Sequence, residues 1–388
     1  MNVSYARIVA IALIMIAVGC SSDDHTASIS DANVVMNTGS GAWDAQDIPG
    51  VQFELTHVFG AEDKPVEALL AGVSAVEVDS AGNLYVLDPP NSRLMAFDAE
   101  GNVLWTVGRP GEGPGEFTNA WSMAYDGGDR LVVLNQRGGR IDIWSTSGTY
   151  QHSISTQPLG TTYLRLLGFA APDTLVFHSP YLEGIGSEIH IAALSDDHLT
   201  LVHQYFIPQG DQTERPPLPV HANVLFSEAE GKVYSGHVEN YQLDVFSLSG
   251  ALTASIRREE NHLLGPAFSG TGRDAEVAVF SGLMPIARFA SGHLVARTWW
   301  PSDIGSREAQ LKHSQLGASY QSCLDFFDAD GVFLGSVACS DNPASELGFP
   351  IAVDGQNRLY TTVSLPYPQI RRYDVTFGQA APVVATAH

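Results

Sequence analysis

The stretch GRPGEGPGEF, residues 108–117, is dense in glycine and proline and ends in an aromatic ring. Two structures use such a stretch: a phosphate-binding loop, or a connector that turns sharply between two packed units. A phosphate-binding loop leads into a helix N-terminus and carries Lys-Ser or Lys-Thr. Here the chain continues as FTNAWSMAYDGGDR, which is typical of a strand and a turn. The stretch therefore predicts a connector, with Phe117 packed between adjacent sheets.

The segments on either side of this connector repeat one another. VSAVEVDSAGNLYVLDPPNSRLMAFDAEGNVLWTV, from Val73, alternates apolar and polar residues in four short runs separated by turns. WSMAYDGGDRLVVLNQRGGRIDIWSTSGTYQHSI, from Trp121, has the same pattern. Four such runs predict one small antiparallel sheet. Further copies begin at Leu164, Asn223, Met284 and Phe349, and the last of them supplies only three strands.

One apolar residue marks each copy, directly after its first hairpin turn. These residues are Leu84, Leu131, Leu175, Val233, Leu294 and Leu359. Their separations of 47, 44, 58, 61 and 65 residues suit four-stranded propeller blades with loops of growing length. We therefore expect an all-β fold, a six-bladed β-propeller of four-stranded antiparallel blades.

The strand missing from the last blade has a candidate at the other end of the chain. VQFELTHVFG, residues 51–60, alternates apolar and polar residues ahead of the first full blade. If it pairs with the strand around Ile370 to Val375, the ring closes and no sheet edge stays open there. The sequence thus predicts that an N-terminal strand completes the last blade.

Three quoted motifs carry a resemblance to a known family. The connector GRPGEGPGEF, the run D-x-x-G-N-L-Y-V-x-D and the run N-x-R-L-x-x-F-D-x-x-G resemble NHL-type six-bladed propellers, and bacterial lipoproteins called six-bladed β-propeller proteins in particular. The resemblance implies that Asp88 with Arg93, and Asn135 with Arg140 at the same spacing, fix the loop between the second and third strands. The alternative is that these residues are ligand groups on the face where those loops open.

The N-terminus has the pattern of an export signal. The apolar run from Ile8 to Val18 is too short to span ~30 Å of hydrocarbon as a helix. The motif AVGC resembles a bacterial lipobox, which implies that residues 1–19 are a signal peptide and that Cys20 is lipidated. Ser21 then points to the outer membrane, facing the periplasm or the cell surface. The alternative is an ordinary secretory signal that is cut nearby.

The composition divides the rest of the chain and limits its partners. Residues 20–50 are rich in Ser, Asp, Asn, Gly and Ala, which predicts a flexible tether ahead of a propeller at 51–378 and a tail at 379–388. The chain has 43 acidic and 20 basic residues, a net charge of −23, and repels phosphate backbones and anionic headgroups. We therefore expect no nucleic acid partner, and membrane contact through the lipid anchor only.

Cys323 and Cys339 flank the segment CLDFFDADGVFLGSVAC, two alternating runs around Asp-Ala-Asp-Gly. This pattern predicts a hairpin whose open end brings the two cysteines together. Outside the cytoplasm such a pair can oxidise, and closing a loop of this length stabilises a fold by about 3 kcal/mol. We expect a disulfide here, and two reduced core thiols are the alternative.

The candidate zinc and calcium sites are implied only by a resemblance to propeller enzymes. Propeller lyases that amidate peptide C-termini hold zinc with histidines from different blades, and His178, His221 and His237 approach one mouth of the predicted channel. Gluconolactonase-type propellers bind calcium through an acid and an amide near the channel. By that resemblance the candidates are Glu77, Asp79, Asn119 and Asn223. The sequence itself requires no cofactor, because it has no HExxH motif and no paired Cys-x-x-Cys spacing.

A binding face is predicted from the main insertion, TWWPSDIGSREAQLKHSQLGAS at 298–319. Adjacent large rings either cover a core edge or contact a partner, and aromatic anchors are frequent at binding sites. The candidate residues of this face are Trp121, His178, Tyr181, His237, Arg297, Trp299 and Trp300. We expect an extracytoplasmic, lipid-anchored module that binds an envelope protein, a peptide or a glycan. The alternatives are a propeller enzyme, either a metal-dependent lyase or a lactonase, and a structural subunit of an envelope complex.

Overall fold

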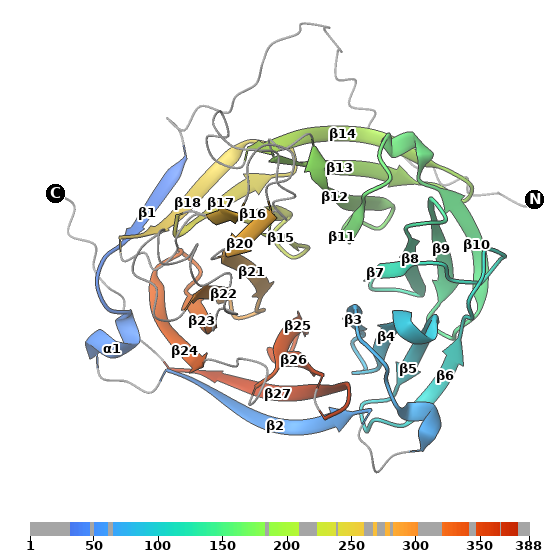
Figure 1. The fold of residues 1–388 in the computed structure, drawn as a ribbon, viewed down its shortest axis with the longest axis horizontal. Coiled ribbons are helices and arrows are strands. Elements are labelled where there is room, and N and C mark those ends of the chain that lie inside the picture. The colour runs from blue at the N-terminus through green and yellow to red at the C-terminus, as the bar shows by residue number, and fades with distance from the viewer. Residues whose placement is uncertain are drawn as a thin grey trace, which may run out of the picture.

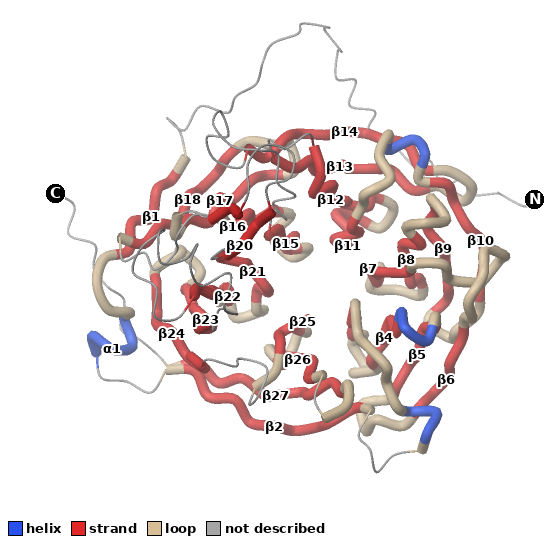
Figure 2. Tube along the Cα trace, in the orientation of Figure 1, coloured by secondary structure: helices blue, strands red, loops and turns tan. Residues whose placement is uncertain are grey.

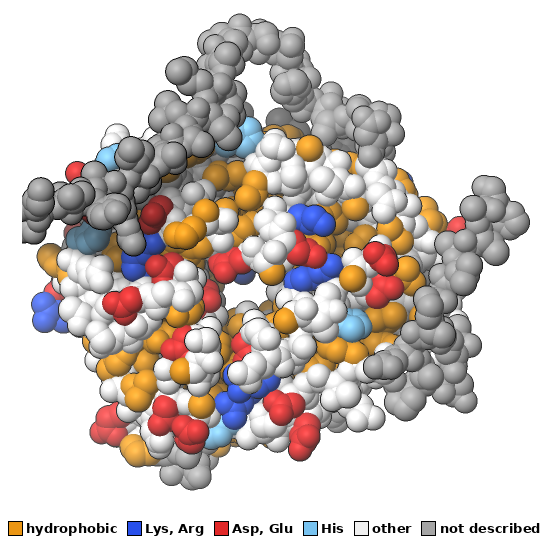
Figure 3. All heavy atoms as spheres, turned by 180° about the vertical axis from the view of Figure 1, so that it is seen from behind, with side chains coloured by type: hydrophobic (Ala, Val, Ile, Leu, Met, Phe, Trp, Pro, Cys, Tyr) orange, Lys and Arg blue, Asp and Glu red, His pale blue; other side chains and the backbone are white. Residues whose placement is uncertain are grey.

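The computed structural model contains six radial sheets around a central axis (Figure 1). It describes residues 32–46, 50–60, 65–182, 186–208, 223–237, 240–259, 267–269, 276–279, 282–301, 320–340, 347–364 and 366–378. Strands dominate these residues, and the helical segments are short (Figure 2). A central opening remains, with acidic and basic side chains around it on the face seen in Figure 3. None of the helices in these ranges is long and apolar enough to cross a membrane.

The first three blades follow one another along the chain. Blade one contains β3 (Ala75–Val78), β4 (Leu84–Asp88), β5 (Arg93–Phe97) and β6 (Val103–Val107). Blade two contains β7 (Ala120–Tyr125), β8 (Arg130–Asn135), β9 (Arg140–Ser145) and β10 (Tyr150–Ser155). Blade three contains β11 (Arg165–Ala171), β12 (Thr174–Leu182), β13 (Gly186–Leu194) and β14 (Leu199–Pro208). Short 3-10 turns lie at η2 (Val66–Ala68), η3 (Pro89–Asn91) and η4 (Gln157–Leu159).

The remaining blades complete the ring. Blade four contains β15 (Asn223–Ser227), β16 (Lys232–Gly236), β17 (Gln242–Ser247) and β18 (Leu252–Arg258). Blade five contains β21 (Gly282–Arg288), β22 (Leu294–Pro301), β23 (Tyr320–Phe327) and β24 (Phe333–Ser340). Blade six contains β25 (Phe349–Val353), β26 (Arg358–Val363), β27 (Gln369–Phe377) and β2 (Val51–Phe59). A separate two-stranded sheet joins β19 (Ala267–Ser269) and β20 (Glu276–Val279).

The ring closes as predicted. β2 pairs antiparallel with β27, from Val51 opposite Phe377 to Phe59 opposite Ile370. The six residues that mark the repeat all lie on the second strand of their blades and have no solvent exposure. Each described hydrophobic cluster contains residues of two neighbouring blades, so the core lies between the sheets. The alternation in the sequence therefore predicted both the fold class and the core.

The connector at 108–117 is held by the blade that follows it. Arg140 donates hydrogen bonds to the backbone carbonyls of Glu112, Gly113 and Glu116, at 2.7, 3.0 and 2.9 Å. Phe117 is 2% exposed and lies in the cluster shared by blades one and two, with its ring centroid 5.8 Å from that of Trp144. The prediction for Phe117 is confirmed.

The predicted tether is wrong over residues 32–46. β1 (Asn33–Asn37) pairs in parallel with β18 and adds a fifth strand to blade four. The helix α1 (Ala42–Gln46) then packs beside β24, where Trp43 is 3% exposed and donates a hydrogen bond to the Gly378 carbonyl at 3.2 Å. The outer edge of β18 offers unpaired backbone groups and Trp43 offers apolar area, and together they outweigh the polar average composition of the segment. We call residues 32–46 the N-terminal strap.

Candidate functional site

The polar ends of the second strands hold loops in place. Asp88 is fully buried, accepts the backbone N–H of Gly72 at 3.0 Å and pairs with Arg93 at 3.0 Å. Asn135 accepts the backbone N–H of Thr118 at 3.2 Å. These contacts agree with the loop-fixing interpretation of the motif. Arg140 differs in detail, because its guanidinium pairs with Asp142 and with the connector carbonyls.

The three histidines proposed as zinc ligands do not form a described cluster. His178 is buried on β12, and His237 Nε2 lies 2.7 Å from Asp244 Oδ2. His221 lies outside the described residues. Within the ranges that the structure describes, no group of three or more His, Cys, Asp or Glu side chains could hold a metal ion.

Two of the candidate calcium ligands, Asp79 and Asn119, make hydrogen bonds within the blades of the repeat. Asp79 accepts the backbone N–H of Ala81 and Asn83 at 2.9 and 2.8 Å, and Asp98, Asp126, Asp328 and Asp354 make the same pair of bonds in their own turns. Asn119 donates a hydrogen bond to Gln136 at 3.1 Å. Burial, and then the nearby Glu228, raise the pKa of Glu77 well above its usual range. The side chain of Asn223 lies outside the described set.

Three exposed aromatic rings lie at the same end of innermost strands, in blades two, three and six. Trp121 on β7 is 56% exposed, Tyr163 ahead of β11 is 57% exposed, and Phe349 at the start of β25 is 37% exposed. Phe349 lies opposite Thr362, and Trp121 lies between the residues paired with Leu134 and Asn135, so both are level with the far ends of the second strands. These innermost strands surround the central opening (Figure 1).

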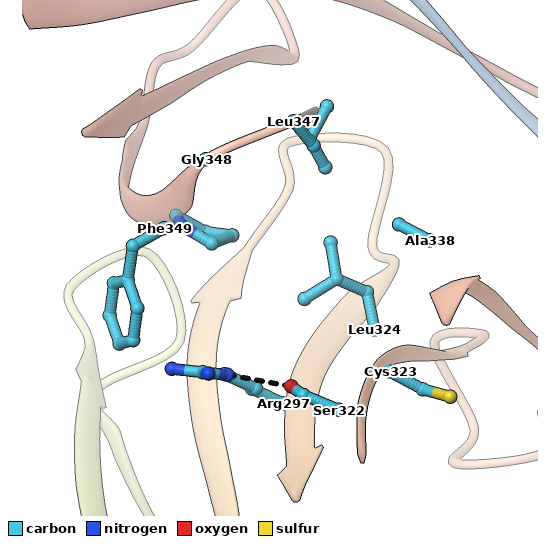
Figure 4. A pocket seen from close by; sticks show the side chains of 9 residues that line it. Arg297, Ser322, Cys323, Leu324, Ala338, Leu347, Gly348 and Phe349 are labelled. Atoms are coloured by element: carbon cyan, nitrogen blue, oxygen red, sulfur yellow. Dashed lines mark hydrogen bonds between the residues drawn. The ribbon is translucent and has the colours of Figure 1, made fainter. Parts of the chain in front are cut away.

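Two arginines accompany these rings. The Arg297 guanidinium lies 4.6 Å from the Phe349 ring centroid, and its Nε donates a hydrogen bond to Ser322 Oγ at 2.8 Å (Figure 4). Burial lowers the pKa of Arg297. Arg165 begins β11 opposite His178 and is exposed to solvent. We call Trp121, Tyr163, Arg165, Arg297 and Phe349 the mouth cluster.

The small pocket in Figure 4 lies beside this cluster, between blades five and six. Its volume is about 40 Å³, and Arg297, Leu324 and Phe349 are among its lining residues. Such a volume suits one or two waters and not a ligand of drug size. The pocket is therefore not itself a ligand site.

The structure divides the predicted binding face into separate places. Trp121 and Arg297 belong to the mouth cluster, whereas Trp300 lines a different cleft between blades four and five. Trp299 covers the blade surface at Gly282, where an added Cβ would come within 2.1 Å of the indole ring, and its ring centroid lies 5.9 Å from the guanidinium of Arg297 in the mouth cluster. The Tyr181 side chain and residues 302–319 lie outside the described residues.

The two cysteines form the disulfide expected from the hairpin. It joins β23 and β24, with the Cα atoms of Cys323 and Cys339 4.2 Å apart. Cys323 also lines the cleft that contains Trp300.

Sequence reasoning missed Tyr163, Arg165, Phe349 and most residues of this cleft, of which it named only Trp300, Cys323 and Cys339. Phe349 was seen only as the start of a copy of the repeat, and the signal for its role is an aromatic residue at the first position of an innermost strand. For the cleft, the signal was the recurring third-strand aspartate in RIDIW, QLDVF and CLDFF.

Comparison with known proteins agrees with the propeller fold. Residues 65–156, which contain η2, the connector and the first two blades, match a family model described as "6-bladed beta-propeller". The match covers two of the six blades and agrees with the six-bladed propeller fold of the whole ring. No curated protein matches the chain in sequence.

Solved structures share the fold of this propeller at low sequence identity. A member of the DUF4221 family from Bacteroides vulgatus superposes with a TM-score of 0.56 at 9% identity, over 84% of this chain and 99% of that one. A Bacteroides fragilis protein described as exported gives a TM-score of 0.52 at 10% identity, over 89% and 100% of the two chains. Virginiamycin B lyase from Staphylococcus aureus is more distant, with a TM-score of 0.42 at 9% identity over 83% and 99%. Identities this low establish the propeller fold alone.

Proposed function

We propose that this propeller is an exported, lipid-anchored binding module, and that the mouth cluster contacts its partner. The observation that carries the proposal is the exposure of Trp121, Tyr163 and Phe349 at the same end of the innermost strands, with the Arg297 guanidinium against the Phe349 ring. Aromatic rings and arginines are the side chains most enriched at the energetic centres of interfaces. A partner that covered this end of the channel would bury all three rings.

The arginines indicate the chemistry of that partner. Arg297 is held by Ser322 and Phe349, so its guanidinium is already oriented before binding. A guanidinium beside aromatic rings recognises carboxylate or hydroxyl groups carried on a flat or apolar body. The partner class is therefore an envelope protein, a peptide or a glycan.

The anchoring part of the proposal rests on the N-terminal sequence. The export signal ends in AVGC, and the first described residue, Ala32, precedes β1 on the outer strand of blade four. Chain from Cys20 to Ala32 spans at most about 40 Å when fully extended. A lipidated Cys20 would therefore keep the propeller close to the membrane surface.

Two experiments test these parts separately. Metabolic labelling with an alkyne fatty acid should mark the wild-type chain but not the Cys20→Ala variant, and equal labelling of both would remove the anchor from the account. For the mouth cluster, detergent-solubilised protein would be used to capture partners from envelope extract. Trp121→Ala and Phe349→Ala should reduce capture of a specific component, whereas Leu104→Ala, which changes an exposed residue of the outer strand β6, should not.

A further inference from the structure

A second cleft lies between blades four and five, whereas the small pocket beside the mouth cluster lies between blades five and six. Its volume is about 450 Å³, within the range of about 300–1,000 Å³ that is usual for small-molecule sites. Tyr241 and Arg258 line it from blade four, and Thr298, Trp300 and Gln321 from blade five. Ser40 and Asp44 of the N-terminal strap border it as well.

The cleft exists because blade five departs from a repeated pattern. Blades two, four and five each place an aspartate on the third strand opposite a serine on the fourth: Asp142 with Ser153, Asp244 with Ser255, and Asp325 with Ser336. In blades two and four, the residue two positions before the aspartate donates a hydrogen bond to the aspartate carboxylate. Arg140 donates to Asp142 at 2.9 Å, and Gln242 donates to Asp244 at 2.9 Å.

Blade five has Cys323 at that position, and its sulfur is bonded to Cys339. No long donor side chain therefore extends from this place over Asp325, and space remains above it.

Asp325 is a structural group in the wall of the cleft. It is 1% exposed and accepts hydrogen bonds from Tyr241, from Thr298 at 3.2 Å and from Ser336 at 2.5 Å. Three hydroxyl donors occupy its two oxygens. A ligand in the cleft would therefore meet the side chains around Asp325 and not the carboxylate itself.

Arg258 is the cationic side chain that these groups hold in position. Its guanidinium lies 3.6 Å from the Phe333 ring centroid and 4.9 Å from that of Tyr241. Its Nη1 also forms an ion pair with Asp325 Oδ2 at 3.9 Å, so neighbours from both blades hold the guanidinium. The side chain is 10% exposed, so a cation of fixed orientation lies on the wall of the cleft.

We propose that this cleft binds a small organic carboxylate whose skeleton also carries hydroxyl or amino groups. The ligand carboxylate would pair with the Arg258 guanidinium, which offers planar, bidentate donors. Trp300 would pack against the skeleton, and Gln321 and Asp44 at the rim would bond the hydroxyl or amino groups.

The charges around the cleft define this selectivity. The chain carries a net charge of −23, and Asp44 adds a carboxylate at the rim, so a simple anion is repelled over most of the approach. A ligand with a donor group offsets the repulsion, because Asp44 accepts its hydrogen bond. Sugar acids and amino acids both have this combination.

Isothermal titration calorimetry of the full chain in detergent tests the proposal. The probes are D-glucuronate and L-glutamate, which separate the sugar-acid and amino-acid sources, with D-glucose and inorganic phosphate as controls. We expect one of the first two to bind, and the controls to bind at least about tenfold more weakly. Binding of neither carboxylate, or equal binding of D-glucose or phosphate, would overturn the proposal.

Variants place the binding in the cleft. Arg258→Gln should weaken the bound probe about tenfold or more, and Arg257→Gln, the matched control one residue earlier on β18, should leave it unchanged. If Arg258→Gln fails to fold, Trp300→Ala and Gln321→Ala decide, since both leave the guanidinium in place and should each weaken binding. Unchanged affinity in all folded cleft variants would refute the site. Trp121→Ala should have no effect, which separates this proposal from the mouth cluster.

Discussion

Tyr241 of blade four donates a hydrogen bond to the buried carboxylate of Asp325 in blade five. This bond crosses between two blades, whereas the equivalent aspartates of blades two and four are covered from within their own strands. The contact also holds the Tyr241 ring beside the Arg258 guanidinium. Stability of this part of the ring and the shape of the cleft therefore depend on the same side chains.

Removing the Tyr241 hydroxyl should destabilise the protein. Tyr241→Phe leaves the buried Asp325 carboxylate with one donor fewer, which we expect to lower the free energy of unfolding by about 1–3 kcal/mol. Urea titration followed by fluorescence measures it. Tyr163→Phe is the control on an exposed tyrosine and should change stability by less than about 0.5 kcal/mol. Equal effects of the two substitutions would contradict the role of this bond.

The Asp325 carboxyl should contribute to the free energy of unfolding in a way that depends on pH, and the sign of that dependence follows from its pKa. Burial raises its pKa above the ordinary 3.8, although its hydroxyl donors and Arg258 act in the opposite direction. The folded state thus keeps this proton to higher pH than the unfolded state. The stability it contributes is complete below about pH 3.8 and is lost as the pH rises through the folded pKa.

Comparison with Asp325→Asn isolates this effect, because the variant removes the titration and nearly preserves the shape. The free energy of unfolding of the wild type minus that of the variant should decrease as the pH rises above about 3.8. Urea titrations at several pH values measure it. A difference that increases with pH would show that the folded pKa is depressed.

The N-terminal strap should contribute to the stability of the propeller. Trp43 lies in the core cluster shared by blades five and six, and Trp43→Ala should cost about 3–5 kcal/mol. Val34→Ala, on the exposed side of β1, should cost far less. Thermal unfolding followed by circular dichroism compares them. If Trp43→Ala unfolds at the same temperature as the wild type, the packing of Trp43 does not stabilise the propeller.

Metal content distinguishes the binding module from the enzyme alternative. His237 is already engaged by Asp244, so we expect purified protein to contain no stoichiometric zinc or calcium. Elemental analysis after dialysis provides the measurement. One zinc per chain, lost in His237→Ala, would instead favour a metal-dependent lyase or lactonase.

The sequence predicted those parts of the fold that depend on local pattern. Leu84, Leu131 and their four equivalents were found by alternation alone, because a residue after a hairpin turn on the second strand packs in the core in every blade. The closing strand followed from the same alternation at 51–60. The packing of Phe117 between two sheets followed from its place at the end of a connector rich in glycine and proline.

Features that depend on contacts between distant segments were missed. The strap was assigned to a tether because its average composition is polar, and the edge of β18 that it covers is more than 200 residues away in the chain. Trp299 and Trp300 are adjacent in sequence but serve different places, since successive strand residues face opposite sides of a sheet. Phe349 and Arg297 come from different blades, so only the closed ring brings them together.

Position-specific photo-crosslinking tests the central claim, that the mouth cluster is the binding face. A photoreactive amino acid would replace Trp121 in one variant and Leu104 on the outer strand β6 in another, both exposed to a similar degree. In intact envelopes, the account predicts a discrete adduct from position 121 that excess unmodified protein competes away, and none from position 104. The same adducts from both positions, or none from position 121, would contradict it.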